Sequence, residues 1–264
     1  MTVTSRGPCE IALPDGGALV AEEAGTGVPV VLIHGFSFDR SLWDPQFLTL
    51  TKQHHTIRYD LRGFGRSSGP VSAQGHVEDL LAVLNAFSVD RAHLVGLSLG
   101  ANIALATAAL HPDRVRSVVL ASPGLPGYPW TTPRPPDEAA GVARRLGIAA
   151  AKEWWLGHEV FRSTERYPAA RAHLAEMVGR WPAYQWAGEP ATPPLPSLTG
   201  YLAALRLPAL VMNGALDVPG YREIASVLHR EIPGARRQEY PDAGHLLNLE
   251  RPTRFNEDVL SFLA

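Results

Sequence analysis

The chain has 264 residues, enough for one large domain with an inserted segment but short for two independent domains. Hydrophobic residues make up 45% and charged residues 19%, and the formal net charge of −2 gives no sign of a nucleic-acid partner. The single cysteine, Cys9, excludes an intramolecular disulfide, and the apolar runs are too short to span a bilayer. Because residues 1–8 lack the basic and apolar regions of a signal peptide, we expect a cytoplasmic protein without a membrane partner.

Short β-rich runs alternate with longer helical patterns, which is typical of an α/β fold with a mostly parallel sheet covered by helices on both faces. The first two strands are predicted to form a hairpin through the turn at 14–17. The eight predicted strands are 10–13, 18–23, 28–33, 56–59, 92–97, 116–121, 209–212 and 236–240. The predicted helices have apolar residues at helical spacing and are 43–52, 74–87, 99–110, 221–232 and 252–263.

Residues 123–207 interrupt this alternation, because they contain no convincing strand and are rich in Pro, Ala, Arg and Trp. Five of the six tryptophans lie here. We interpret the segment as a helical lid (cap) inserted into a core domain of residues 1–122 and 208–264. Open α/β sheets bind ligands at the carboxyl ends of their strands, so the lid is expected to pack there. Alternatively, the aromatic side chains form only the core of a small helical subdomain.

Ser98 lies in the frame Gly96-Leu-Ser-Leu-Gly100, behind a predicted strand and ahead of a predicted helix. A serine on a sharp strand-to-helix turn takes a strained backbone conformation, and small flanking residues let the neighbouring chain pass close to it. This pattern is typical of a nucleophile elbow, which presents the serine hydroxyl at the top of the sheet. Because Gly, Ser and Leu are common residues, the pentapeptide alone also fits a Gly-rich turn without chemistry.

A serine hydroxyl needs a base to take its proton, so the elbow predicts a histidine and a carboxylate downstream. Asp217 follows a predicted strand and a glycine turn, and His245 follows the last predicted strand. Asp242, three residues before His245, is instead predicted to shape that turn. The remaining histidines that we considered are predicted at strand starts or on exposed helix faces: His54, His55, His111, His158, His173 and His229. The expected catalytic residues are therefore Ser98, Asp217 and His245.

An oxyanion hole is also required, because a tetrahedral intermediate carries a negative oxygen that preorganised donors must stabilise. The buried strand at 28–33 ends in His34-Gly35, and the glycine allows a turn that aims the backbone N–H of Phe36 at the site. The second donor is predicted to be the N–H of Leu99, at the helix start. His34 is expected to support the loop by hydrogen bonding and to point away from Ser98.

These motifs, in this order, resemble the α/β-hydrolase superfamily over essentially the whole chain outside the lid. They are His34-Gly-Phe36, Asp60-Leu-Arg-Gly-Phe-Gly-Arg-Ser67, Gly96-Leu-Ser-Leu-Gly100, Asp217 and Gly244-His245. Within the superfamily, 41–46, 58–63 and 245–252 are similar to the 3-oxoadipate enol-lactonase group and its esterase and cofactor-free haloperoxidase relatives. His34-Gly35 is commoner among the esterases and haloperoxidase-like members, so the resemblance leaves ester and lactone substrates both open. We assign 60–67 a structural role, with Arg62 in ion pairs.

The resemblance implies a serine hydrolase that cleaves a small carboxylic ester or lactone through an acyl-enzyme intermediate. No metal or organic cofactor is expected, since the sequence has no zinc-type Cys/His cluster, Walker loop or dinucleotide-binding glycine motif. The same constellation also allows C–C bond hydrolysis, perhydrolase or haloperoxidase-like chemistry, a non-hydrolytic biosynthetic reaction or a non-catalytic ligand receptor. The sequence leaves the oligomeric state open, and a homo-oligomer is compatible with it.

Overall fold

The computed structural model describes residues 5–68, 75–187 and 193–264. Within these ranges eight strands form one sheet in the order β1-β2-β4-β3-β5-β6-β7-β8. β1 pairs with β2, and β2 with β4, in antiparallel fashion, whereas all further pairs are parallel. The strands are β1 (Ser5–Ala12), β2 (Ala18–Ala24), β3 (Pro29–Ile33), β4 (His55–Tyr59), β5 (Ala92–Leu97), β6 (Val115–Ala121), β7 (Ala209–Gly214) and β8 (Arg236–Tyr240). The predicted mostly parallel, eight-stranded sheet is confirmed.

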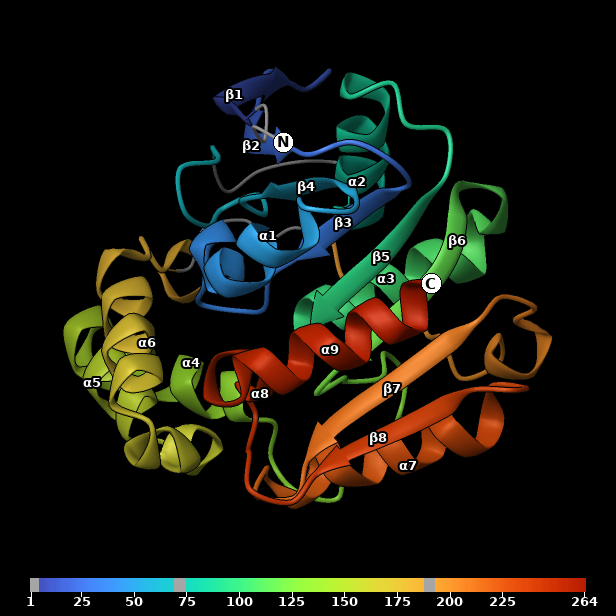
Figure 1. The fold of residues 1–264 in the computed structure, drawn as a ribbon. Coiled ribbons are helices and arrows are strands. Elements are labelled where there is room, and N and C mark those ends of the chain that lie inside the picture. Colours follow the sequence, from blue (N-terminus) through green and yellow to red (C-terminus); the bar gives the residue numbers. More distant parts are fainter. Residues whose placement is uncertain (1–4, 69–74, 188–192) are drawn as a thin grey trace.

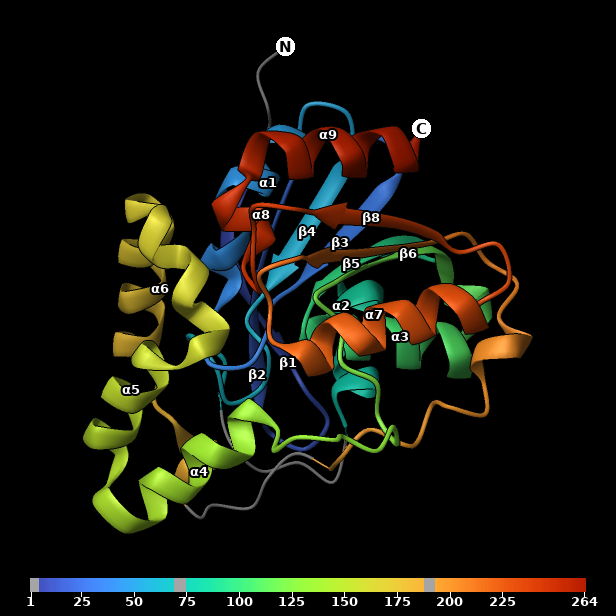
Figure 2. The same cartoon turned by 90° about the horizontal axis from the view of Figure 1, so that it is seen from below.

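Helices cover both faces of this sheet (Figure 2). One face carries α1 (Asp44–Leu50) and α9 (Pro252–Leu263), and the other carries α2 (His76–Ala86), α3 (Leu99–Leu110) and α7 (Pro219–Glu231). The central strands are apolar almost throughout because both of their faces are buried. The short elements η1 (Arg40–Trp43), η2 (Pro112–Arg114) and α8 (Leu247–Glu250) complete the connections of the sheet. No helix in the described ranges is long and apolar enough to cross a membrane.

The described residues between β6 and β7 form helices and irregular chain without a strand, as predicted for 123–207. In Figures 1 and 2, α4 to α6 stand together on the side toward which the arrowheads of β5, β7 and β8 point. The helical insertion therefore lies at the carboxyl edge of the sheet. Its elements are α4 (Pro135–Leu146), α5 (Ile148–Gly157), η3 (Glu159–Arg166), α6 (Pro168–Arg180), η4 (Tyr184–Trp186) and η5 (Leu202–Ala204).

Several element boundaries differ from the predicted ones, and for two of them the reason can be identified. β1 begins at Ser5, five residues earlier than predicted, and its register with β2 shifts between Arg6 and Cys9. Pro8 lies within that irregularity, where an edge strand tolerates a missing N–H. α7 begins at Pro219 because proline is favoured in the first helical turn, so Tyr221 lies inside the helix. The predicted start of α2 at position 74 falls outside the described residues.

Candidate active site

Ser98 occupies a strained turn between β5 and α3. Its backbone angles are φ 55° and ψ −112°, a positive φ that non-glycine residues rarely adopt. Its side chain is largely buried, with the whole residue 8% exposed, yet it lines a cavity. The turn therefore has the strained conformation predicted for a nucleophile elbow.

The glycines on either side of Ser98 are required by close backbone approach. A Cβ at Gly96 would lie 2.2 Å from the carbonyl oxygen of Gly100. A Cβ at Gly100 would lie 2.0 Å from the carbonyl oxygen of Ile33, at the end of the neighbouring strand β3. Because both obstacles are backbone atoms, no side-chain movement could relieve these contacts. The Gly-x-Ser-x-Gly frame thus has a steric cause, as the sequence indicated.

Asp217 and His245 come together at the ends of β7 and β8. The Nδ1 atom of His245 lies 2.8 Å from Oδ2 of Asp217, and both side chains are almost completely buried. The other carboxylate oxygen of Asp217 accepts a hydrogen bond from the N–H of Val218 at 2.8 Å. A proton on Nδ1 that is donated to the carboxylate leaves Nε2 as the acceptor of the imidazole. The structure thus joins two of the three residues predicted from chain order.

The loop that carries His245 is fixed by other groups. Glu250 accepts hydrogen bonds from the N–H of Gly244 at 2.7 Å and from the hydroxyl of Ser163, in the helical insertion, at 2.8 Å. Burial raises the pKa of the Glu250 carboxyl despite these hydrogen bonds. Asp242 pairs with Arg251 at the surface and not with His245. Of the two carboxylates, Asp217 therefore contacts His245 and Asp242 does not.

The two backbone donors predicted for an oxyanion hole, the N–H groups of Phe36 and Leu99, belong to residues that line the same cavity as Ser98. Leu99 is the first residue of α3, where helical amides have no partner within the helix. Neither N–H group donates a backbone hydrogen bond within the described part of the chain. Both donors are thus unoccupied and adjacent to the cavity.

His34 supports the loop that follows β3. Its Nδ1 lies 2.8 Å from the carbonyl oxygen of Gly35, and its Nε2 accepts a hydrogen bond from the N–H of Leu61 at 2.9 Å. Burial lowers the pKa of His34 in spite of the nearby charge of Asp60, so the ring is neutral. Because both ring nitrogens are engaged by backbone groups, the predicted supporting role is confirmed.

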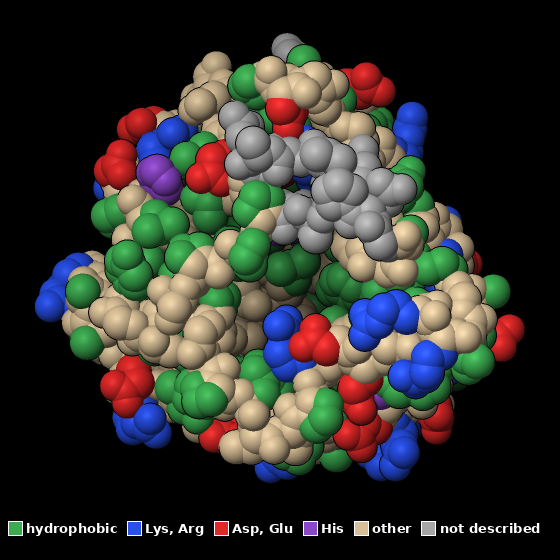
Figure 3. All heavy atoms as spheres, turned by 180° about the vertical axis from the view of Figure 1, so that it is seen from behind, with side chains coloured by type: hydrophobic (Ala, Val, Ile, Leu, Met, Phe, Trp, Pro, Cys, Tyr) green, Lys and Arg blue, Asp and Glu red, His purple; other side chains and the backbone are tan. Residues whose placement is uncertain are grey.

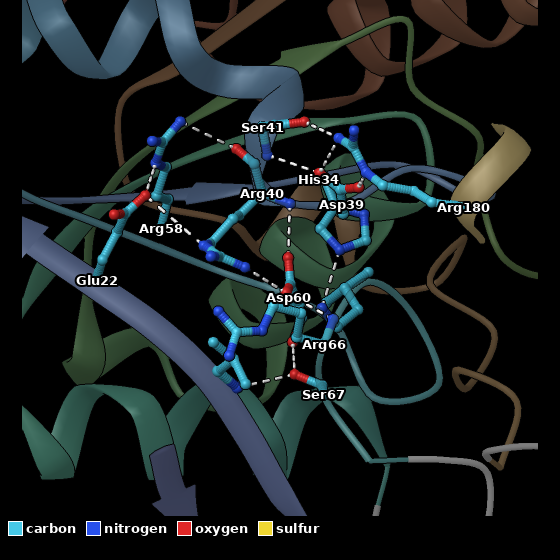
Figure 4. A network of polar contacts seen from close by, with 12 residues as sticks. Glu22, His34, Asp39, Arg40, Ser41, Arg58, Asp60, Arg66, Ser67 and Arg180 are labelled. Atoms are coloured by element: carbon cyan, nitrogen blue, oxygen red, sulfur yellow. Dashed lines mark hydrogen bonds and ion pairs between the residues drawn. The ribbon is translucent and has the colours of Figure 1, made fainter. Parts of the chain in front are cut away.

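A polar network fixes the segments around this loop (Figure 4). The carboxylate of Asp60 accepts hydrogen bonds from the backbone N–H groups of Arg40 and Arg66 at 2.8 and 2.9 Å, and from the Arg40 guanidinium at 2.6 Å. Arg180, at the end of α6, donates two hydrogen bonds to the carboxylate of Asp39 at 2.6 and 3.0 Å. The network therefore joins the helical insertion to the loop after β3.

The stretch at 60–67 has the structural role predicted for it. The buried guanidinium of Arg62 donates two hydrogen bonds to Asp79, on α2, at 3.0 and 2.6 Å. It also lies 3.0 Å from the carboxylate of Asp15 in the β1–β2 hairpin. Arg62 therefore connects the hairpin to a helix and does not face the cavity, because it is absent from the cavity lining among the described residues.

A cavity of about 520 Å³ opens beside Ser98. Its wall combines apolar side chains with polar surface, including the titratable side chains of His76, Arg134, Asp137 and Tyr221. Figure 3 shows a hollow in the surface with hydrophobic side chains inside it and basic and acidic side chains at its edge, which fits this mixed lining. The volume is in the range of pockets that take small organic ligands.

The five tryptophans of the insertion have different surroundings. Trp130 and Trp186 line the cavity, as the lid interpretation expects. Trp155 and Trp181 are buried in an aromatic cluster around Phe36, with ring centroids 6.2 and 5.0 Å from its ring. Trp154 is 37% exposed. Tryptophans of the insertion thus contribute both to the cavity wall and to the aromatic cluster.

Sequence reasoning missed two residues that the cavity reveals. His76, at the start of α2, lines the cavity, and burial lowers its pKa to about 4, so the ring is neutral near pH 7. Tyr221 lies beside both Ser98 and His245. The sequence contains one indication of this placement. Tyr221 lies four residues after Asp217 and two residues after Pro219, which starts a helix.

The family model of the alpha/beta hydrolase fold matches residues 28–252 of this chain. Among curated proteins, the carboxylesterase YbfK of Bacillus subtilis is 28% identical over 247 residues, which cover 89% of this chain and 80% of the relative. The 2-hydroxymuconate semialdehyde hydrolase of Pseudomonas sp. strain CF600 is 29% identical over 258 residues, which cover 92% and 89%.

Solved structures show the same similarity over almost the full length. Est816, described as an N-acyl homoserine lactone degrading enzyme, has 30% identity and a TM-score of 0.81, with 96% of this chain and 100% of that one covered. The enol-lactonase of Burkholderia xenovorans LB400 has 27% identity and a TM-score of 0.84, with 97% and 99% covered.

Proposed function

Because this chain belongs to the α/β-hydrolase fold family, we propose that it is a serine hydrolase that cleaves a carboxylic ester or a lactone. Ser98 is the nucleophile, His245 the general base and acid, and Asp217 the group that orients the imidazole. The observation that carries the proposal is the hydrogen bond of 2.8 Å between buried His245 and buried Asp217, next to a serine in a strained turn at a cavity.

The reaction has two acyl-transfer steps. Ser98 attacks the carbonyl carbon while Nε2 of His245 takes its proton, and Asp217 stabilises the imidazolium that forms. The N–H groups of Phe36 and Leu99 hold the oxyanion, and the N-terminus of α3 adds its favourable dipole. His245 then protonates the leaving oxygen, and an activated water releases the acyl group from Ser98. Besides the substrate and water, the proposed reaction uses only groups of this chain.

The substrate is proposed to be a small molecule bound in the cavity under residues 123–207, which act as a lid over the core of 1–122 and 208–264. The apolar part of the wall supports an acyl or alcohol portion with hydrophobic surface, and a volume of about 520 Å³ limits its size. The carboxylesterase, lactone-degrading and enol-lactonase names among the similar proteins support this substrate class.

The proposal is tested with a panel of short acyclic esters, aromatic esters and small lactones that include an enol-lactone. Ser98→Ala serves as the blank for each compound. We expect Ser98-dependent hydrolysis, and a preference of about 100-fold for one class, roughly 2.7 kcal/mol, would assign the enzyme to the esterases or to the lactonases. The absence of Ser98-dependent hydrolysis of both classes would contradict the proposal.

Hydrolysis of a C–C bond is the second candidate, because a semialdehyde hydrolase is among the similar proteins. This reaction would use the same three residues but a substrate with a ketone beside the bond that breaks. Adding a vinylogous 1,5-diketone acid to the panel separates the candidates. Faster turnover of that compound than of every ester and lactone would favour C–C hydrolysis.

A further inference from the structure

Tyr221 lies in the first turn of α7, four residues after Asp217, and its side chain faces the cavity beside Ser98. The residue is only 6% exposed, and its ring packs against that of His245. The mechanism proposed above has no role for this hydroxyl. A buried polar group next to a nucleophile therefore needs an explanation.

Neighbouring rings fix the Tyr221 side chain from two sides. Its ring centroid lies 4.3 Å from that of His245 and 5.0 Å from that of Trp130, which is edge-on at 84°. Trp130 packs directly on the start of α7, since a Cβ at Gly220 would lie 2.4 Å from its ring. The tyrosine ring is thus held between the imidazole and the helical insertion, with little freedom to rotate away.

The hydroxyl is a hydrogen-bond donor at ordinary pH. Burial raises the pKa of Tyr221 well above its usual value, and the negative charge of Asp217 raises it further. The influence of Ser98 and the charge of Arg134 lower the pKa but do not reverse this rise. Because the phenol keeps its proton, Tyr221 can donate to an oxygen that gains negative charge.

We infer that the hydroxyl of Tyr221 donates a hydrogen bond to the leaving-group oxygen of the substrate, which makes Tyr221 a further catalytic residue. The inference rests on the proposed serine hydrolase function. In the acylation step the leaving oxygen is bound to the substrate carbonyl carbon that Oγ of Ser98 has attacked, so it lies near Ser98. It must also approach Nε2 of His245, which protonates it. Because Tyr221 lines the cavity together with Ser98 and its ring packs on that of His245, we place its hydroxyl on the side of the leaving oxygen.

The step is balanced without a further reactant. When the tetrahedral intermediate collapses, the bond between the carbonyl carbon and the leaving oxygen breaks, and its electron pair stays on that oxygen. The proton comes from His245, and Tyr221 keeps its own proton while its hydrogen bond shortens. Such a donor matters most when the leaving group is a poor one, so the natural substrate is an unactivated alkyl ester or an aliphatic lactone.

The test compares two butanoate esters, ethyl and p-nitrophenyl, in the wild-type protein and in Tyr221→Phe. The variant keeps the ring that packs on His245 and Trp130 and loses only the hydroxyl. We expect kcat/KM for the ethyl ester to fall about 10- to 100-fold, as for the loss of one strong hydrogen bond, and for the p-nitrophenyl ester less than about threefold.

Tyr128→Phe is the matched control. Tyr128 also lines the cavity, but its hydroxyl donates to Glu223 at 2.7 Å instead of facing Ser98. This variant is expected to leave the ratio of the two kcat/KM values unchanged. An equal fall for both esters in Tyr221→Phe would indicate a merely structural role and overturn the inference, while the proposed function would stand.

A measurement on the wild-type protein covers the case in which Tyr221→Phe does not fold. Across butanoate esters of alcohols and phenols, a donor at the leaving oxygen predicts a shallow dependence of kcat/KM on the pKa of the leaving group. A steep loss toward the alkyl esters would overturn the inference. If the wild-type protein hydrolyses no ester or lactone in a Ser98-dependent way, both the inference and the proposed function fail.

Discussion

The indole N–H of Trp155 donates a hydrogen bond of 2.8 Å to the hydroxyl of Ser37. Trp155 belongs to α5 of the helical insertion, whereas Ser37 follows the predicted oxyanion donor Phe36 and has a positive φ of 66°. Both side chains are buried. The insertion therefore helps to hold a loop of the core in a conformation that an isolated loop would rarely adopt.

Trp155→Phe should lower both stability and kcat. The substitution leaves the buried Ser37 hydroxyl without its donor, which costs about 1–3 kcal/mol of unfolding free energy, and loosens the loop that carries the Phe36 N–H. Urea unfolding and initial rates measure the two effects. Trp154→Phe, at the exposed neighbouring position on α5, is the control and should change neither. If Trp155→Phe and Trp154→Phe have the same unfolding free energy and the same kcat, the hydrogen bond between Trp155 and Ser37 contributes to neither.

Acid should weaken the attachment of the insertion through Asp39. Burial alone would raise the pKa of Asp39, but the hydrogen bonds from Arg180 and Ser41 outweigh it and lower the pKa to about 2. A depressed pKa in the folded state contributes stability that is complete above the unfolded value near 4 and is lost as the pH falls toward 2.

Urea unfolding at a series of pH values measures this contribution. The wild-type protein should lose more unfolding free energy between pH 4 and pH 2 than Asp39→Asn, whose amide does not titrate. If the two curves run parallel through this window, the pair with Arg180 does not stabilise the folded state.

Gly100→Ala should be among the most destabilising substitutions in the chain. The added Cβ would meet the backbone oxygen of Ile33 at 2.0 Å, so β3 and α3 would have to separate. We expect a loss of more than about 3 kcal/mol in urea unfolding, together with a loss of activity. Gly179→Ala is the control, because the exposed position near the end of α6 has open space for a Cβ.

That control should gain up to about 1 kcal/mol from the better helix propensity of alanine. A Gly100→Ala protein within about 1 kcal/mol of the wild type would mean that the backbone contact at the elbow is not as close as described.

The two candidate carboxylates should differ sharply in their effect on catalysis. Asp217→Asn should lower kcat on the order of 10³- to 10⁴-fold, since the amide no longer favours the imidazolium form of His245. Asp242→Asn breaks a half-exposed pair with Arg251 and should change kcat less than about tenfold. Initial rates on one p-nitrophenyl ester measure both. Similar losses in the two variants would contradict the assignment of Asp217.

The sheet was predictable because its strands carry their own local signal. β5 has its predicted bounds, since a nearly continuous apolar run is bounded there by Arg91 and Ser98, and the polar strand β8 has its predicted bounds as well. β1 was predicted too short because its first half contains Gly7 and Pro8, which disfavour a regular strand. Only its pairing with β2 at the edge of the sheet makes that half extended.

The site was predictable to the extent that its residues lie in recognisable local frames. Ser98 has its two glycines, and Asp217 and His245 each follow a strand. Tyr221 has no such frame, because its importance comes from the fold that places α7 beside the elbow. The sequence likewise could not show which tryptophans line the cavity and which pack in the aromatic cluster, since both environments use the same residue type.

Covalent labelling with a fluorophosphonate, read by mass spectrometry of the digested protein, tests the assignment of the nucleophile. The proposed function predicts one phosphonylated site, Ser98, with labelling lost in Ser98→Ala and greatly slowed in His245→Ala. Ester hydrolysis should be lost in the same two variants, by on the order of 10⁴- to 10⁶-fold in kcat. Labelling of another residue, or ester hydrolysis that persists in Ser98→Ala, would contradict the proposed serine hydrolase.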